Sequence, residues 1–168
     1  PNQFGQNVTG FIGQNFKRAR EEQTNKELEA ESQAAVAPGS AFDVWQKGYS
    51  DSVSQVEKSL LDYQTRLFEK LRPNLIMSLQ SQGLLNTGAL NEAFAGAAKD
   101  LTEASQDSVA NARGAISQDI ANQRYGLQSA PRDYRLNTSM NSVPALTAAG
   151  QTALGNVWQN QMNMNSIN

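Results

Sequence analysis

The strongest pattern of apolar and polar positions lies between residues 41 and 72. Apolar side chains recur there at steps of three and four residues, which is the spacing of one face of an α-helix. Nine positions form this heptad-like seam: Phe42, Trp45, Tyr49, Val53, Val56, Leu60, Tyr63, Leu67 and Leu71. The pattern predicts a long helix that kinks or restarts at Pro73, because proline lacks a backbone donor, and that continues to about Ser81.

A second apolar stripe predicts another long helix, from about Ala89 to Tyr125. Small residues line this stripe and would let a neighbouring helix approach closely. The larger members of the stripe are Leu90, Phe94, Leu101, Val109, Ile116 and Ile120. The two glycines of the segment 82–88 favour a turn between the helices, with a cap at Asn86 or Thr87. We therefore predict an antiparallel, coiled-coil-like helical hairpin over residues 40–125.

The segment 1–16 contains no charged residue. Its large apolar residues are close to helical spacing, although three glycines interrupt them: Phe4, Val8, Phe11, Ile12 and Phe16. One interpretation is a helix that packs between protomers, or a segment that becomes ordered only on assembly. The other is an amphipathic segment that inserts into a membrane interface. The absence of Lys and Arg from residues 1–16 argues against membrane contact, so the first interpretation is favoured.

A polar helix of mixed charge is predicted over residues 17–36. Pro38 and Gly39 end it, and Ser40 is a candidate N-cap for the next helix. Together with the uncharged start, this helix forms a first segment, residues 1–39.

The segment 126–168 is predicted to be a connector, broken by Pro131, followed by a helix that Ser142 caps. This last helix carries no charge on any face, and a soluble monomer rarely exposes such a surface. We therefore expect both ends of the chain to contact partners. The candidate contact residues are Phe4, Phe11, Ile12, Phe16, Leu146, Val157 and Trp158.

Charge is concentrated in the middle of the chain. All 30 charged residues lie between Lys17 and Arg135, and the net charge is −2. Such a balance gives no long-range attraction to nucleic acid. Two charge-free ends suggest surfaces that other subunits cover. The expected fold is therefore all-α: a long hairpin with extended, partner-bound terminal segments, assembled as an oligomeric ring or tube.

The composition argues against a catalytic function. The chain has no cysteine and no histidine, which removes thiol nucleophiles, zinc–thiolate sites and the commonest general base. The glycines of residues 83–90 have the outline of a phosphate loop, but the Lys-Ser/Thr that should follow is missing. We predict that the protein is not an enzyme and has no catalytic residue, cofactor or metal site.

Two groups of charged residues have structural interpretations. The carboxylates of Asp100, Glu103 and Asp107 share a helical face, which we interpret as a solvated surface. A sparse group of arginines is expected to pair with acidic residues across a subunit boundary: Arg113, Arg124, Arg132 and Arg135.

The segment Ser81–Phe94, SQGLLNTGALNEAF, resembles a pattern found in internal virion and DNA-ejection (pilot) proteins of tailed bacteriophages. An Ala/Gln/Asp helix and an Asn/Gln-rich tail follow it, as in those proteins. The resemblance covers roughly residues 41–160. It implies a mostly helical, multimeric protein that is carried near the portal or tail and helps the genome cross the host envelope. It implies no individual functional residue.

The resulting hypothesis is a structural virion protein that helps form a conduit for genome delivery. Its partners would be copies of itself and portal or tail proteins, and DNA would pass without specific contact. It would reside inside the capsid or at the portal or tail, and in the host envelope during infection. The alternatives are a head–tail connector or minor tail protein and, more distantly, a bacterial helical-bundle binding protein.

Overall fold

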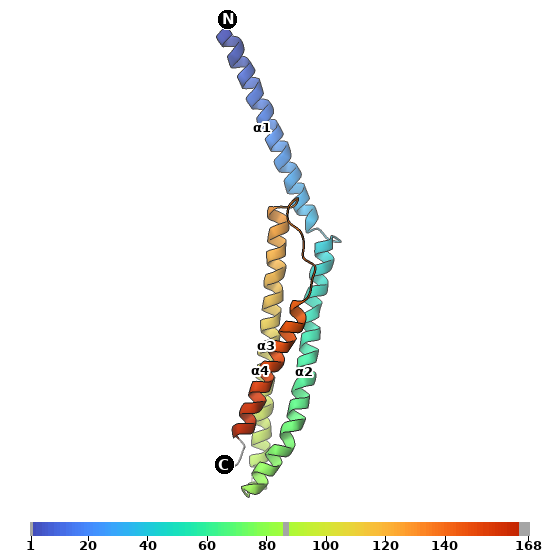
Figure 1. Ribbon diagram of the computed structural model, residues 1–168, viewed down its shortest axis with the longest axis vertical. Helices are drawn as coiled ribbons and strands as arrows, with labels where there is room; N and C mark the ends of the chain where they lie inside the picture. Colours follow the sequence, from blue (N-terminus) through green and yellow to red (C-terminus); the bar gives the residue numbers. More distant parts are fainter. Residues whose placement is uncertain (1, 86–87, 165–168) are drawn as a thin grey trace. The chain divides into compact units, whose positions relative to one another are not determined.

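The computed structural model describes residues 2–85 and 88–164, with side chains from residue 12 onward. Within these residues the chain forms four α-helices and no β-strand (Figure 1). The helices are α1 (Asn2–Ala35), α2 (Ala41–Ser81), α3 (Ala89–Ser129) and α4 (Ser142–Met164). The predicted all-α class is confirmed. The proposed caps Asn86 and Thr87 lie outside the described residues.

Contacts divide the chain into two compact units. Unit 1 comprises Pro1–Gln46 and Ile120–Thr138, and unit 2 comprises Lys47–Asp119 and Ser139–Asn168. Helices α2 and α3 therefore contribute to both units. Each unit comprises two separate stretches of sequence, because α2 and α3 pass from one unit into the other.

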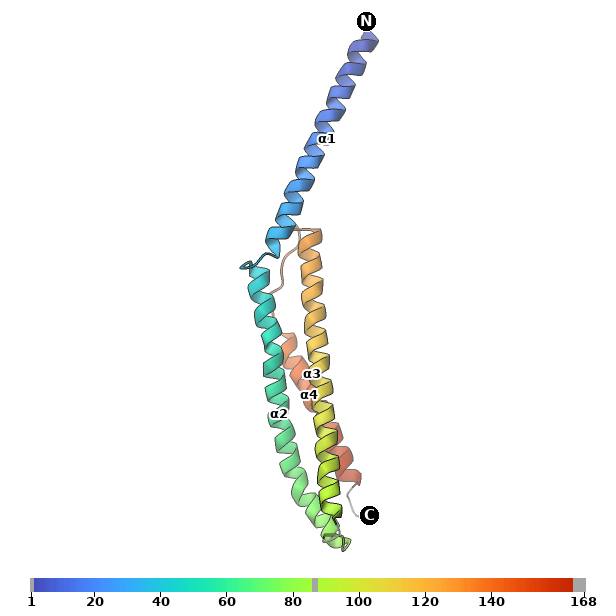
Figure 2. The same cartoon turned by 180° about the vertical axis from the view of Figure 1, so that it is seen from behind.

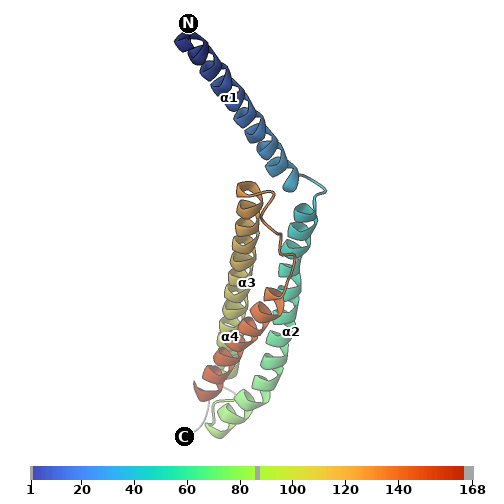
Figure 3. The same ribbon diagram turned by 45° about the horizontal axis from the view of Figure 1, so that its top comes forward.

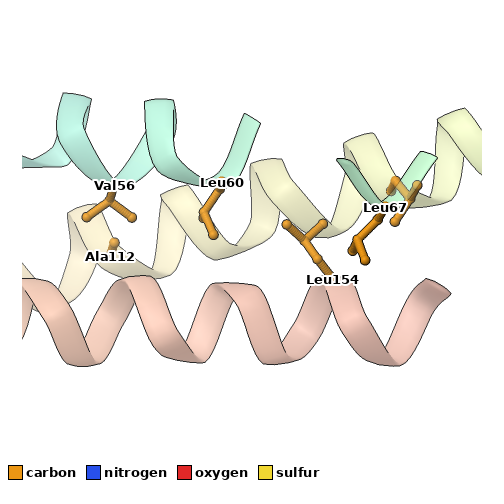
Figure 4. Close-up of a cluster of buried hydrophobic side chains, with 6 residues drawn as sticks. Val56, Leu60, Leu67, Ala112 and Leu154 are labelled. Atoms are coloured by element: carbon orange, nitrogen blue, oxygen red, sulfur yellow. The ribbon is translucent and has the colours of Figure 1, made fainter. Parts of the chain in front are cut away.

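Unit 2 is built from parts of α2 and α3 and from the whole of α4. Figures 1 and 2 show α4 lying along α2 and α3, and Figure 3 shows the connector that leads from the end of α3 to the start of α4. One buried cluster joins all three helices and consists of Val56, Leu60, Leu67, Leu101, Ala112 and Leu154. Figure 4 shows Leu60, Leu67 and Leu154 directed into the space between the helices. A second cluster contains Leu71, Leu75 and Ala97. Burial of these apolar side chains is the main stabilising term of the unit.

Glycine ends α2 by a specific backbone arrangement. Gly83 has a φ of 73°, a left-handed value that residues with a Cβ rarely adopt. The amide of Leu84 donates to the carbonyl of Leu79 at 2.9 Å, and the amide of Gly83 donates to the carbonyl of Gln80 at 3.1 Å. These two bonds form a Schellman motif, which satisfies the last carbonyls of a helix. A helix terminus therefore accounts for the first glycine of the phosphate-loop outline.

The predicted N-cap at Ser40 is confirmed. The Ser40 hydroxyl accepts a hydrogen bond from the backbone amide of Asp43 at 3.1 Å, and the Asp43 carboxylate accepts one from the amide of Gly39 at 2.9 Å. This reciprocal pair resembles a capping box.

Helix α2 continues through Pro73 without interruption. Of the two predicted outcomes, a kink or a restart, the restart does not occur, and Figure 2 shows α2 curving over its C-terminal part. Leu71 and Leu75, on either side of the proline, are both fully buried. Tertiary packing thus outweighs the lost hydrogen bond to the carbonyl of Glu69.

Replacing Pro73 with alanine is expected to raise the free energy of unfolding by about 1–2 kcal/mol. The substitution restores a helix donor and removes the clash of the ring with the preceding turn, and the greater freedom of the unfolded chain offsets part of the gain. Urea denaturation followed by circular dichroism would measure the change. A loss of stability would mean that the core requires the curvature that the proline produces.

Candidate functional site

The predicted seam residues lie in the chain's own core. On α2, every seam residue except the half-buried Tyr63 is buried. On α3, Leu101 and Ile116 are buried, whereas the others are half-buried: Leu90, Phe94, Val109 and Ile120. The stripes that the sequence suggests for helix assembly are therefore covered by helices of the same chain.

The candidate contacts of the last helix also lie within the chain. Leu146, Val157 and Trp158 are partly buried against the cluster that joins α2, α3 and α4, and Leu154 beside them is fully buried. The uncharged pattern of this helix predicts contact with an external partner for these residues. The structure differs because α2 and α3 provide the apolar surface that this uncharged helix needs.

Among the candidate contacts of the N-terminal segment, the two with described side chains, Ile12 and Phe16, are exposed. Ile12 is 47% exposed and Phe16 is 66% exposed. Every side chain of α1 from residue 12 to residue 27 is exposed. The side chains of Phe4 and Phe11 lie outside the part of the chain that the structure describes.

A buried tyrosine connects the three helices of unit 2. The Tyr49 hydroxyl on α2 forms a hydrogen bond with the Ser142 hydroxyl at the start of α4. Burial raises the pKa of Tyr49; the hydrogen bond to Ser142 lowers it, and Asp119 on α3 raises it further. The local sequence pattern indicates only a seam position for Tyr49 and only a cap for Ser142. Their distance of 93 positions along the chain hides the pair from local pattern reading.

Replacing Tyr49 with phenylalanine is expected to lower the free energy of unfolding by about 1 kcal/mol at neutral pH, because a buried hydrogen bond is lost. The raised pKa of Tyr49 stabilises the fold below the ordinary tyrosine value of 10.0, and this contribution is lost as the pH rises through the folded-state pKa. The difference in free energy of unfolding between the wild type and the variant should therefore become smaller at alkaline pH. Guanidinium denaturation at several pH values would measure this difference. A difference that does not change with pH would exclude a contribution of Tyr49 ionisation to the stability.

Arginines form contacts inside unit 1. The Arg132 guanidinium donates to both oxygens of Glu31, at 2.8 and 2.9 Å. Arg124 donates to the side-chain oxygen of Gln46 at 3.0 Å and lies 5.2 Å from the ring centre of Phe42. The predicted pairing of Arg132 across a subunit boundary is therefore replaced by a pair within the chain.

The contact between Arg132 and Glu31 attaches the end of α1 to the connector. The single hydroxyl proton of Ser32 on α1 is shared between the carbonyl of Leu28, at 2.8 Å, and the carbonyl of Gln128 on α3, at 2.9 Å. The hydrogen bond from Arg132 holds the pKa of Glu31 below its ordinary value. Glu31 therefore stabilises this attachment above the carboxyl pKa of the unfolded chain, and the contribution is lost as the pH falls through the folded-state value.

Two of the three carboxylates on the acidic face of α3 contact polar side chains. Asp100 accepts a hydrogen bond from the side-chain amide of Gln161 at 2.6 Å, and Glu103 pairs with Lys99 at 4.0 Å. Asp107 lies beside them on an open hollow between α3 and α4. No group of three histidine, cysteine, aspartate or glutamate residues in the described chain is placed to hold a metal ion.

The described helices also lack a stretch that is both long enough and apolar enough to cross a membrane.

Comparisons with protein-family models, with curated proteins and with solved structures find no match for this chain.

Proposed function

We propose that this chain is a structural protein of a tailed-bacteriophage particle, and specifically an ejection protein that assembles in several copies. The observation that carries the proposal is the uncovered stretch of α1, residues 12–27, in a helix of 34 residues. Helices in proteins owe most of their stability to tertiary packing, so this stretch needs a surface outside its own chain. The resemblance of Ser81–Phe94 to phage ejection proteins suggests that this surface belongs to a phage particle.

The proposed architecture is a ring or tube of helical hairpins. Helices α2 and α3 have 41 residues each, which corresponds to a length of roughly 60 Å. In the proposal they form the two arms of a coiled-coil-like hairpin whose turn is near residues 82–88. Inside the particle, a portal or tail ring would cover the exposed part of α1.

The charge of the chain suits a conduit for DNA. The net charge is −2, and 33 of the 168 residues are asparagine or glutamine. A wall of amide groups with little positive charge forms few tight phosphate contacts, because those come mainly from lysine and arginine. DNA could then pass along such a wall without being held.

Quantitative mass spectrometry of purified particles would test the function. Particles are analysed before and after the genome is released by the isolated receptor. We expect several copies per particle before release and a large loss of the protein afterwards. Retention after release would instead favour a head–tail connector or minor tail protein, and absence from both samples would exclude a virion protein.

A further inference from the structure

Helix α1 joins two stretches that differ in composition. The sequence suggests an uncharged segment, residues 1–16, followed by a separate polar helix, but the structure has one uninterrupted helix from Asn2 to Ala35. Three basic residues, Lys17, Arg18 and Arg20, therefore lie on the same helix within about one turn of Phe16. All three are exposed.

The first half of α1 is amphipathic by position. Each residue advances roughly 100° around an α-helix, so its five large apolar positions fall within less than half of the circumference: 4, 8, 11, 12 and 16. The opposite side contains only asparagine, glutamine, threonine and glycine. At the described end of this face, the side chains of Ile12 and Phe16 are 47% and 66% exposed.

We propose that α1 binds the surface of an anionic lipid bilayer. The helix would lie in the interface with its apolar side among the acyl chains, and the three cations would contact lipid phosphates. Glu21 and Glu22 follow on the next turn, so the attraction is local and the apolar side contributes most of the binding. The proposal goes beyond the function proposed above and does not require that the chain belong to a phage.

The charges favour a lipid surface over a second copy of α1. Residues 1–20 contain no aspartate or glutamate. Parallel pairing of two copies would place the three cations of one helix beside those of the other. Antiparallel overlap of the apolar stretches would leave the cations of both copies beyond the overlap, where only the acidic residues of the same helix, Glu21 and Glu22, offset them. Anionic headgroups supply further negative charge to all three cations in a single arrangement.

Co-sedimentation of the full chain with vesicles tests the proposal. The vesicles contain equal parts phosphatidylcholine and phosphatidylglycerol, or phosphatidylcholine alone. The double variant Ile12→Gln and Phe16→Gln is expected to partition onto the anionic vesicles at least about tenfold more weakly. Leu61→Gln on α2 is the matched control, because Leu61 is 48% exposed and Ile12 is 47% exposed. This control should bind as the wild type does.

A triple variant tests the charge independently. Lys17→Gln, Arg18→Gln and Arg20→Gln together should weaken binding to the anionic vesicles and leave the weaker binding to phosphatidylcholine unchanged. The proposal is overturned if the wild type stays in the supernatant, or if the double variant binds as tightly as the Leu61 variant. Sedimentation equilibrium identifies the alternative: loss of a dimer in the double variant, without vesicle binding by the wild type, assigns the face to a second copy.

Discussion

Replacing Gly150 with valine is expected to detach α4 from the core of unit 2 and to lower the free energy of unfolding by about 3 kcal/mol. A Cβ atom at Gly150 would lie 2.7 Å from both terminal methyl groups of Leu60. Leu60 is fully buried in the cluster that α2, α3 and α4 share, so displacing its methyl groups would disturb that cluster. Glycine at this position therefore sets how closely α4 approaches α2.

Gly155 on the same helix provides the matched control. The nearest atom to a Cβ at Gly155 is the Tyr63 hydroxyl oxygen at 3.9 Å, an ordinary contact distance. Gly155→Ala should raise the free energy of unfolding by about 0.5–1 kcal/mol, because alanine is the better helix former. Denaturation curves of both variants give the comparison. Equal stability of the two would show that α4 does not pack on Leu60 as closely as the structure has it.

The sequence predicts the positions of the helices well because the apolar spacing is regular. The seam from Phe42 to Leu71 and the stripe from Leu90 to Ile120 both fall inside long helices. Ser40 is recognisable as a cap because it stands immediately before an apolar repeat and after Pro38 and Gly39. These features are local, so a single stretch of sequence contains the information that determines them.

The sequence does not show which surface covers each apolar face. An uncharged helix with spaced apolar residues has the same pattern whether it packs on a partner or on its own chain. The pattern around Leu146 and Trp158 therefore predicts contact with a partner, although the structure packs them on α2 and α3. Only the three-dimensional arrangement distinguishes this helix from α1, where Phe16 stays exposed.

For a related reason, the sequence does not reveal the long-range polar contacts or the continuity of helix α2 at Pro73. The residues of the Arg132–Glu31 pair are 101 positions apart, and no periodic pattern relates them. At Pro73, the local rule disfavours a helix, but the burial of Leu71 and Leu75 on the same helix outweighs it. Both outcomes depend on the free energy of the whole fold rather than on one segment.

Replacing Leu101 with alanine tests whether the seam belongs to the chain itself. Leu101 is fully buried in the cluster that α2, α3 and α4 share. The variant should lose about 3 kcal/mol of stability, as expected for a cavity in a packed core. Leu61→Ala, at a site that is 48% exposed, should change the stability by no more than about 0.5 kcal/mol.

Measuring the stability of the wild type and of the Leu101 variant at several protein concentrations makes this test decisive. If Leu101 packs against helices of its own chain, its contribution does not involve association. The difference between wild type and variant should then be the same in dilute and concentrated protein. If Leu101 instead lay at a boundary between copies, the lower stability of the variant would be coupled to dissociation of the subunits, because subunit binding adds to stability by mass action. A difference that changed on dilution would therefore place the seam between subunits and contradict the packing of unit 2.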